Sequence, residues 1–300
     1  MHPTLERLRG TVGIWTHACE SLLPGRVGEV TSQLEVAGFR ALWVPEAYGR
    51  EAMTGAQLLL ERSSDLVVAT GIASIYARDA MAAASAARTL AAASDDRFVL
   101  GLGVSHRPLV ERVRGGVYDP PLAAMSSYLD ALEGAAVLSA ERDVVVPTVL
   151  AALGPKMLHL AADRTGGALS YLVTAAHTGR AREALGPDAF LAVEQSVVLG
   201  EGRDEFLRRA HEHLNIYTGL ENYRASWRRL GFGDEDFVRG GSERLCDALV
   251  VHGDAAAIGR RVDEHLDAGA DHVCLQVLGA TLSDVPLREW GGLGSQLTSR

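Results

Sequence analysis

The stretch LVVATGIASIYARDAMAAASAARTLAAASDDRFVLGLG, residues 66–103, contains two apolar runs separated by an alanine-rich segment. The runs at 66–73 and 97–103 are rich in Val, Ile and Leu and have the length of strands, whereas 79–93 is long enough for a helix. A strand–helix–strand succession of this kind predicts two parallel strands joined by a crossover helix.

The same alternation recurs on both sides of this unit. Helical punctuation supports it: 26–37 ends at Gly38, and 254–268 begins at a capping Asp254 and ends at Gly269. The expected strands are 11–17, 40–45, 66–73, 97–103, 146–152, 167–172, 189–199 and 271–278. Eight alternating strands predict an α/β fold of the (β/α)8 TIM-barrel type. The stretch 203–250, between the seventh and eighth strands, is expected to be a helical insertion of two or three helices.

Composition limits the possible partners. With 300 residues, 47% of them hydrophobic, the chain can bury a large core, and we expect one domain over 1–300. The net charge is −9 and the basic residues form no run, so no nucleic-acid partner is expected. We expect neither a signal peptide nor a membrane span, and therefore a cytoplasmic protein. Three scattered cysteines predict neither a disulfide framework nor a zinc site.

In a (β/α)8 barrel the active site forms at the carboxyl ends of the strands. The polar residues there include His17, Glu46, Tyr48, His106, His177, Glu194 and Gln276. No strand end carries a histidine pair, so no catalytic metal is expected, and the G-x-S-x-G elbow of serine hydrolases is missing. The GLG at 101–103 is a weak dinucleotide-loop signal, and its glycines can instead relieve crowding inside the barrel.

Four stretches, taken in order, resemble the luciferase-like superfamily, and within it the actinobacterial type of deazaflavin-dependent oxidoreductase. They are GFRALWVPEAYGREA (38–52), LVVATGIASIYARDAMAAASAARTLAAAS (66–94), RFVLGLGVSHRPLVE (97–111) and TVLAALGPKMLHLAADRTGGALSYL (148–172). The resemblance implies an enzyme that transfers a hydride between coenzyme F420 and an unidentified small organic substrate. FMN is the alternative cofactor.

The resemblance also implies a cofactor site. TGIAS at 70–74 is expected to form a β-bulge behind the cofactor ring, with a cis peptide at Gly71–Ile72. The cofactor phosphate is expected at the helix starts after strands five and six, where backbone N–H groups bind anions. The expected cofactor-binding residues are Trp43, Gly71, Ile72, Ala73, Ser74, Ser105, Leu153, Gly154, Lys156, Thr174, Ala175, Ala176 and His177. The alternatives are a tight strand exit at 71, a plain helix start at 154–155 and a core role for Trp43.

Glu46, Tyr48 and His106 are the expected catalytic residues. His106 suits a general acid because the usual pKa of histidine lies near neutral pH, although it could simply hydrogen-bond a loop. Glu46 could instead form a structural ion pair with Arg78 or Arg107. Related sugar-phosphate dehydrogenases carry a histidine after this acid, and Ala47 in its place argues against the same oxidation.

Three other functions compete with the deazaflavin hypothesis. An FMN-dependent two-component monooxygenase and a non-catalytic cofactor-binding barrel share the scaffold. A phosphate-binding barrel lyase or isomerase fits less well, because few glycines follow strands seven and eight. For any of them we expect a small-molecule ligand and a homodimer.

Overall fold

The computed structural model describes residues 1–281 and 284–298. In this part of the chain, eight parallel strands close into a barrel in the order β1-β2-β3-β5-β6-β7-β8-β10, and β10 pairs with β1. The strands are β1 (Thr11–Trp15), β2 (Ala41–Val44), β3 (Val67–Thr70), β5 (Phe98–Gly103), β6 (Thr148–Ala151), β7 (Gly167–Ser170), β8 (Phe190–Leu199) and β10 (His272–Val277). The predicted (β/α)8 barrel and each of its eight strands are confirmed.

Two further short strands were not predicted from the sequence. β4 (Ala73–Ser74) follows β3 after a break and pairs with β5. β9 (Val250–Gly253) pairs with the last residues of β8, while the first residues of β8 pair with β7. β8 therefore extends beyond the end of β7. Past that point, β9 pairs with the edge of β8 that β7 no longer covers.

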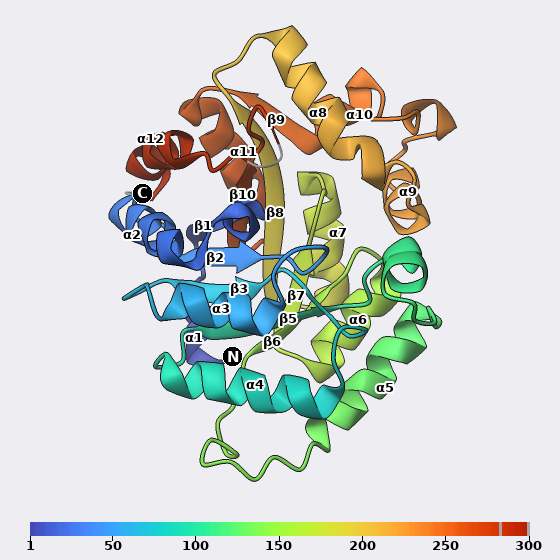
Figure 1. Cartoon of the computed structure of the whole chain (residues 1–300). Coiled ribbons are helices and arrows are strands. Elements are labelled where there is room, and N and C mark those ends of the chain that lie inside the picture. Colours follow the sequence, from blue (N-terminus) through green and yellow to red (C-terminus); the bar gives the residue numbers. More distant parts are fainter. Residues whose placement is uncertain (282–283, 299–300) are drawn as a thin grey trace.

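Helices surround the barrel and also cover one of its ends (Figure 1). They are α1 (Pro3–Glu6), α2 (Val27–Val36), α3 (Ala52–Leu60), α4 (Ala80–Ala93), α5 (Pro121–Glu133), α6 (Pro155–Arg164), α7 (Ala175–Leu185), α8 (Arg203–Tyr217), α9 (Glu221–Arg228), α10 (Glu243–Leu249), α11 (Ala255–Asp267) and α12 (Leu287–Leu297). The predicted cap of α11 is present, because Asp254 accepts a hydrogen bond from the Ala257 N–H at 2.8 Å. The stretch 203–250 contains α8, α9 and α10, and its status as an insertion stays a prediction.

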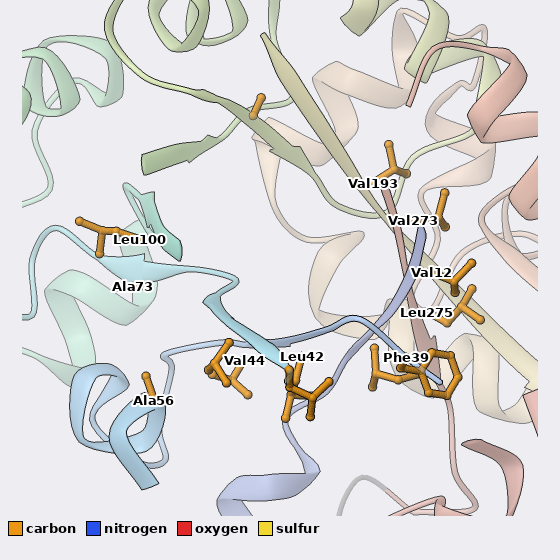
Figure 2. Packing of buried hydrophobic residues seen from close by; sticks show 14 of the residues in the cluster. Val12, Phe39, Leu42, Val44, Ala56, Ala73, Leu100, Val193, Val273 and Leu275 are labelled. Atoms are coloured by element: carbon orange, nitrogen blue, oxygen red, sulfur yellow. The ribbon is translucent and has the colours of Figure 1, made fainter. Parts of the chain in front are cut away.

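A continuous apolar layer joins the outer faces of the strands to the helices. Figure 2 shows part of it, with Val12 of β1 beside Val273 and Leu275 of β10. Side chains alternate between the two faces of a strand, so every second residue of each strand enters this layer. Its burial holds the helices against the barrel.

A second apolar cluster fills the barrel interior. It includes Leu5 and Leu8 near the amino terminus, Trp15 of β1, Trp43 of β2 and Phe190 at the start of β8. The interior is therefore a packed core, as in other barrels of this type. Trp43 is fully buried in this core, and its role in cofactor binding stays a prediction.

A third cluster lies where α8, α9 and α10 pack together, at the upper right of Figure 1. Trp227 of α9 is fully buried there, and its indole N–H donates to the Leu172 carbonyl, just past β7, at 3.1 Å. The helices after β8 therefore cover the carboxyl end of the barrel on the β7 side.

Candidate active site

β3 ends in a backbone bulge at the carboxyl end of the barrel. The Gly71–Ile72 peptide is cis, as the family resemblance implied. The Gly71 carbonyl accepts a hydrogen bond from Trp15 Nε1 at 2.8 Å, and the Gly71 N–H donates to the Val44 carbonyl at 2.7 Å. A Cβ atom at residue 71 would lie 2.8 Å from Trp15 Nε1, so the site requires glycine.

Glu46 clamps this bulge from the end of β2. Its backbone N–H donates to the Ile72 carbonyl at 3.1 Å, and its carboxylate accepts from the Ser74 N–H at 2.9 Å. The carboxylate also forms an ion pair with Arg78, and Glu46 is 6% exposed. The structural ion pair with Arg78 is thus confirmed, whereas a catalytic role for Glu46 stays a prediction.

The glycines of β5 make room for the same bulge. A Cβ atom at Gly101 would lie 1.9 Å from the Thr70 carbonyl oxygen, and one at Gly103 would lie 2.4 Å from Ile72 Cδ1. Backbone atoms cannot yield to such a contact as a flexible side chain can. Relief of crowding, the alternative to a dinucleotide loop, is confirmed.

The predicted phosphate site lies where α6 and α7 begin. Gly154 and Pro155 start α6, and the Thr174 side chain caps α7 by accepting from the His177 N–H at 3.3 Å. The two helix starts are joined, because His177 Nε2 lies 3.1 Å from the Leu153 carbonyl oxygen. Helix amino termini carry positive partial charge and free N–H groups, so this junction favours an anion.

His177 leaves one polar atom unused at this junction. It is 4% exposed, and its Nδ1 has no hydrogen-bond partner among the described residues. Burial lowers the pKa of His177. Nε2 faces the Leu153 carbonyl and therefore carries the ring proton, so Nδ1 is an acceptor. Buried polar atoms are normally satisfied, so this unpaired acceptor indicates a place for a hydrogen-bond donor of a ligand.

Two arginines that sequence reasoning did not select lie at the same junction. Arg229, after α9, donates to the Leu153 carbonyl at 2.8 Å, and Arg180 of α7 donates to the Arg229 carbonyl. Within the described ranges neither forms a salt bridge with a carboxylate. Burial and the neighbouring Arg180 lower the pKa of Arg229. We call the starts of α6 and α7 with His177, Arg180 and Arg229 the anion site.

An aromatic layer lies over the barrel interior, with Tyr171 at its centre. The Tyr171 ring lies 5.0 Å from Trp15 of β1 and 5.5 Å from Tyr217 of α8. Tyr223 of α9 lies 6.4 Å from Tyr171 and 5.9 Å from the His106 ring. Burial lowers the pKa of His106. The layer thus connects the predicted acid His106 with the strand ends on the opposite side.

Glu194 of β8 lies in the barrel interior and is 0% exposed. Its carboxylate accepts hydrogen bonds from the Leu172 N–H at 3.0 Å and from Ser196 Oγ at 2.7 Å. Ser196 Oγ in turn lies 3.1 Å from His213 Nε2 of α8. Burial raises the pKa of Glu194 to about 7, although both hydrogen bonds lower it. We call these three side chains the Glu194 chain.

A small cleft lies beside His213 of the Glu194 chain. Its volume is about 20 Å³, and its wall includes His17, Arg209, Glu212, His213 and Gln276. Tyr171 donates to Gln276 Oε1 at 2.7 Å, so the aromatic layer contacts one residue of the cleft wall. Sequence reasoning placed Glu194 and Gln276 at strand ends but gave no sign that His213 joins them.

The remaining predicted residues are spread more widely. Tyr48 is 75% exposed in the loop after β2, and Lys156 is exposed at the start of α6. Ser105, before His106, has φ of 55°, a left-handed conformation that is uncommon for serine. Ala175 and Ala176 form the first turn of α7 at the anion site. The predicted bulge residues therefore lie together at the end of β3, and the predicted phosphate-binding residues lie together at the starts of α6 and α7. Tyr48 lies apart from both groups.

Over residues 1–281 and 284–298, no three His, Cys, Asp or Glu side chains are grouped so as to hold a metal ion. No helix in these ranges combines the length and apolar character needed to cross a membrane.

The fold and site describe a (β/α)8 barrel with a backbone bulge and an anion site at its carboxyl end. Residues 11–272 match the Luciferase-like monooxygenase family, and the chain belongs to that family. The resemblance seen in the sequence is confirmed.

Two relatives share sequence with the chain. A Mycobacterium tuberculosis protein named as a coenzyme F420-dependent oxidoreductase is 34% identical over 107 residues, covering 36% of this chain and 31% of that protein. The 5,10-methylenetetrahydromethanopterin reductase of Methanolobus tindarius is 25% identical over 163 residues, covering 48% and 49%. The matched part spans less than half of either relative.

Solved structures share the fold at low identity. An F420-dependent secondary alcohol dehydrogenase with an F420–acetone adduct has a TM-score of 0.73 at 14% identity, covering 97% of this chain and 98% of that one. The F420-dependent tetrahydromethanopterin reductase of Methanopyrus kandleri has a TM-score of 0.70 at 18% identity, covering 96% and 97%. A type II Baeyer-Villiger monooxygenase from Pseudomonas putida with FMN reaches 0.69 at 14%, also covering 96% and 97%.

Proposed function

We propose that this protein is an oxidoreductase that binds the deazaflavin coenzyme F420 and transfers a hydride between it and a small organic substrate. The anion site is the observation that carries the proposal. It combines two helix starts and two arginines without a carboxylate partner in the described chain. These groups fit the phosphate of a flavin-type cofactor.

The bulge and the anion site would hold different parts of such a cofactor. Gly71, Ile72, Ala73 and Ser74 present a backbone wall at the end of β3, kept in place by Glu46. The anion site follows β6 and β7, further along the same barrel wall. A ring supported by the bulge and a phosphate at the anion site would place the cofactor across the carboxyl end. Its proposed ligands there are Ser105, Leu153, Gly154, Lys156, Thr174, Ala175, Ala176, His177, Arg180 and Arg229.

The bound deazaflavin supplies two-electron hydride chemistry, so the chain has to orient the reactants and manage one proton. His106 is the proposed proton-exchanging group, because its imidazole lies at the edge of the aromatic layer beside Tyr223. Glu46 contributes by fixing the bulge. Tyr48 could contact a ligand only from its exposed loop.

Binding titrations test the proposal. The purified protein is titrated with oxidised coenzyme F420 and separately with FMN, and fluorescence gives both dissociation constants. We expect clear preference for F420. Arg229→Gln should weaken F420 binding about tenfold, because it removes a charged hydrogen-bond donor from the anion site.

Arg228→Gln is the matched control. Arg228 is the neighbouring residue, but it pairs with Glu221 and Asp234. Its substitution should leave the dissociation constant unchanged. Tighter binding of FMN would favour a two-component monooxygenase, and binding of neither cofactor would overturn the proposal in favour of a non-catalytic barrel.

A further inference from the structure

Glu194 is an unusual buried carboxylate because, in the part of the chain that the structure describes, no lysine or arginine pairs with it. Among the described residues its hydrogen-bond partners are the Leu172 N–H and the Ser196 hydroxyl, and no lysine or arginine bonds to it. Buried charges are normally paired, and a buried acid without a partner tends to exchange protons. Such a group inside a ligand-binding barrel is a candidate for chemistry.

The hydrogen bonds of the Glu194 chain have a defined direction. Ser196 Oγ has a single proton, which it donates to Glu194 Oε1 at 2.7 Å. The contact of 3.1 Å between Ser196 Oγ and His213 Nε2 then requires the proton on Nε2. Nδ1 is consequently the ring nitrogen left to accept a proton, and His213 belongs to the wall of the cleft.

The strand order of the barrel places the Glu194 chain opposite the bulge. In the strand order, β8 is four strands from β3 in either direction, so the two strands face each other across the interior. Glu194 follows Phe190 and Ala192 on the inward face of β8. A ring resting on the bulge would therefore have the Glu194 chain on the opposite side of the barrel.

We propose that Glu194, Ser196 and His213 form a proton relay between the buried barrel interior and the cleft, with Glu194 as the proton store and His213 as the group that exchanges protons with water in the cleft. The relay exists independently of any cofactor, whereas its use in catalysis rests on the proposed hydride transfer. The relay lies on β8 and α8, and is thus separate from His106, which follows β5.

The relay carries a proton between the cleft and the barrel interior, separately from the proton assigned to His106. His213 Nδ1 takes a proton from a hydronium ion that reaches the cleft, leaving a water molecule. His213 Nε2 passes its own proton to Ser196 Oγ, and Ser196 passes its own to Glu194 Oε1. The serine and the imidazole remain neutral, and Glu194 ends as a carboxylic acid. The reverse sequence returns the proton to the cleft.

The surroundings suit these roles. Burial, and then the nearby His17, lower the pKa of His213 to about 3, so its imidazole conducts a proton without holding a charge. The titratable groups near Glu194 on other elements are neutral phenols and a thiol: Tyr171, Tyr217, Tyr223 and Cys274. The charged groups in the cleft wall are Arg209, Glu212 and Asp284.

Infrared difference spectroscopy of the full chain tests the relay without a cofactor. A protonated-carboxyl C=O band should titrate with a midpoint near pH 7. It should vanish in Glu194→Gln, which keeps an oxygen to accept from Leu172. After transfer into D2O the band should shift at once in the native chain. The shift should be about tenfold slower or more in Ser196→Ala and His213→Leu, because exchange then needs local opening of the core.

His265→Leu is the matched control, since His265 is another buried histidine bonded to a hydroxyl, that of Thr178, at 2.8 Å. It should keep the native exchange rate, and so should His106→Gln. The relay is overturned if no band near pH 7 depends on Glu194, or if Ser196→Ala and His213→Leu exchange as fast as the native chain. Failure of F420 binding would leave this result standing, so the two proposals fail separately.

Discussion

Glu46 and Glu194 are both buried carboxylates at the carboxyl end of the barrel, yet their surroundings differ. Glu46 bonds to Arg78 and to the Ser74 N–H, so its charge is neutralised and its geometry fixed. Glu194 bonds to neutral donors, and burial raises its pKa to about 7. A paired carboxylate holds backbone in place, whereas an unpaired one can gain and lose a proton near neutral pH. The wall at β2 and β3 therefore holds the backbone bulge in position, and the wall at β8 exchanges protons.

The largest expected effect comes from removing the paired carboxylate. Glu46→Ala should lower the free energy of unfolding by about 4 kcal/mol, because it leaves the buried Arg78 short of a partner and the Ser74 N–H unsatisfied. Denaturant unfolding measures the change. The double variant Glu46→Ala/Arg78→Met should recover part of the loss. If Glu46→Ala lowered the free energy of unfolding less than Glu194→Gln does, the contrast between the two carboxylates would be contradicted.

The pH dependence of stability separates the two carboxylates next. The pKa of Glu194 rises on folding from its ordinary value near 4.5 to about 7, so its contribution is fully present below pH 4.5 and is lost as the pH rises through 7. Between pH 5 and 8 the native chain should lose about 3 kcal/mol relative to Glu194→Gln. Parallel unfolding curves for the two proteins across this range would show that Glu194 is ionised throughout.

The rigidity of the bulge wall gives a smaller effect. Gly101→Ala should lower the free energy of unfolding by about 2 kcal/mol, because the new methyl group would lie 1.9 Å from the Thr70 carbonyl oxygen. Gly291→Ala is the control: it lies in α12 with nothing within 4 Å, and should be neutral or stabilising. Equal effects at both positions would mean that the bulge wall can adjust.

The smallest expected effect lies in the aromatic layer above Glu194. Tyr217→Phe removes a hydroxyl that lies 3.1 Å from the Tyr171 hydroxyl, and should cost about 1 kcal/mol because the hydrogen bond joins two neutral groups. Thermal unfolding at several pH values measures it. A cost that changes strongly with pH would show that Tyr217 is coupled to the charge of Glu194 and belongs to the relay.

Local sequence patterns predicted much of the scaffold. The eight strands and the cap of α11 depend on neighbouring residues, which the sequence displays directly. The bulge after β3 and the phosphate site at the two helix starts were expected only because the sequence resembles the luciferase-like superfamily.

Contacts between distant segments were beyond the sequence patterns. Arg229 reaches Leu153, and His213 reaches Ser196, only because α8 and α9 fold back over the barrel end. Spacing along α8 separates the faces of His211 and His213 but says nothing about which strand each face meets. The sequence also could not show that, among the described residues, no lysine or arginine lies against Glu194, because this depends on how the chain folds. β9 was missed because its four residues carry no alternation beyond the end of α10.

The division between a positioning wall and a proton-exchanging wall is tested most directly by measuring F420 binding to Glu46→Gln and Glu194→Gln side by side. Each variant is first shown to be folded by circular dichroism. We expect Glu46→Gln to raise the dissociation constant about tenfold or more, because the bulge loses its clamp. Glu194→Gln should change it by no more than about twofold, because the amide keeps the Leu172 hydrogen bond. Weak binding by Glu194→Gln with native binding by Glu46→Gln would contradict the assignment of the two walls.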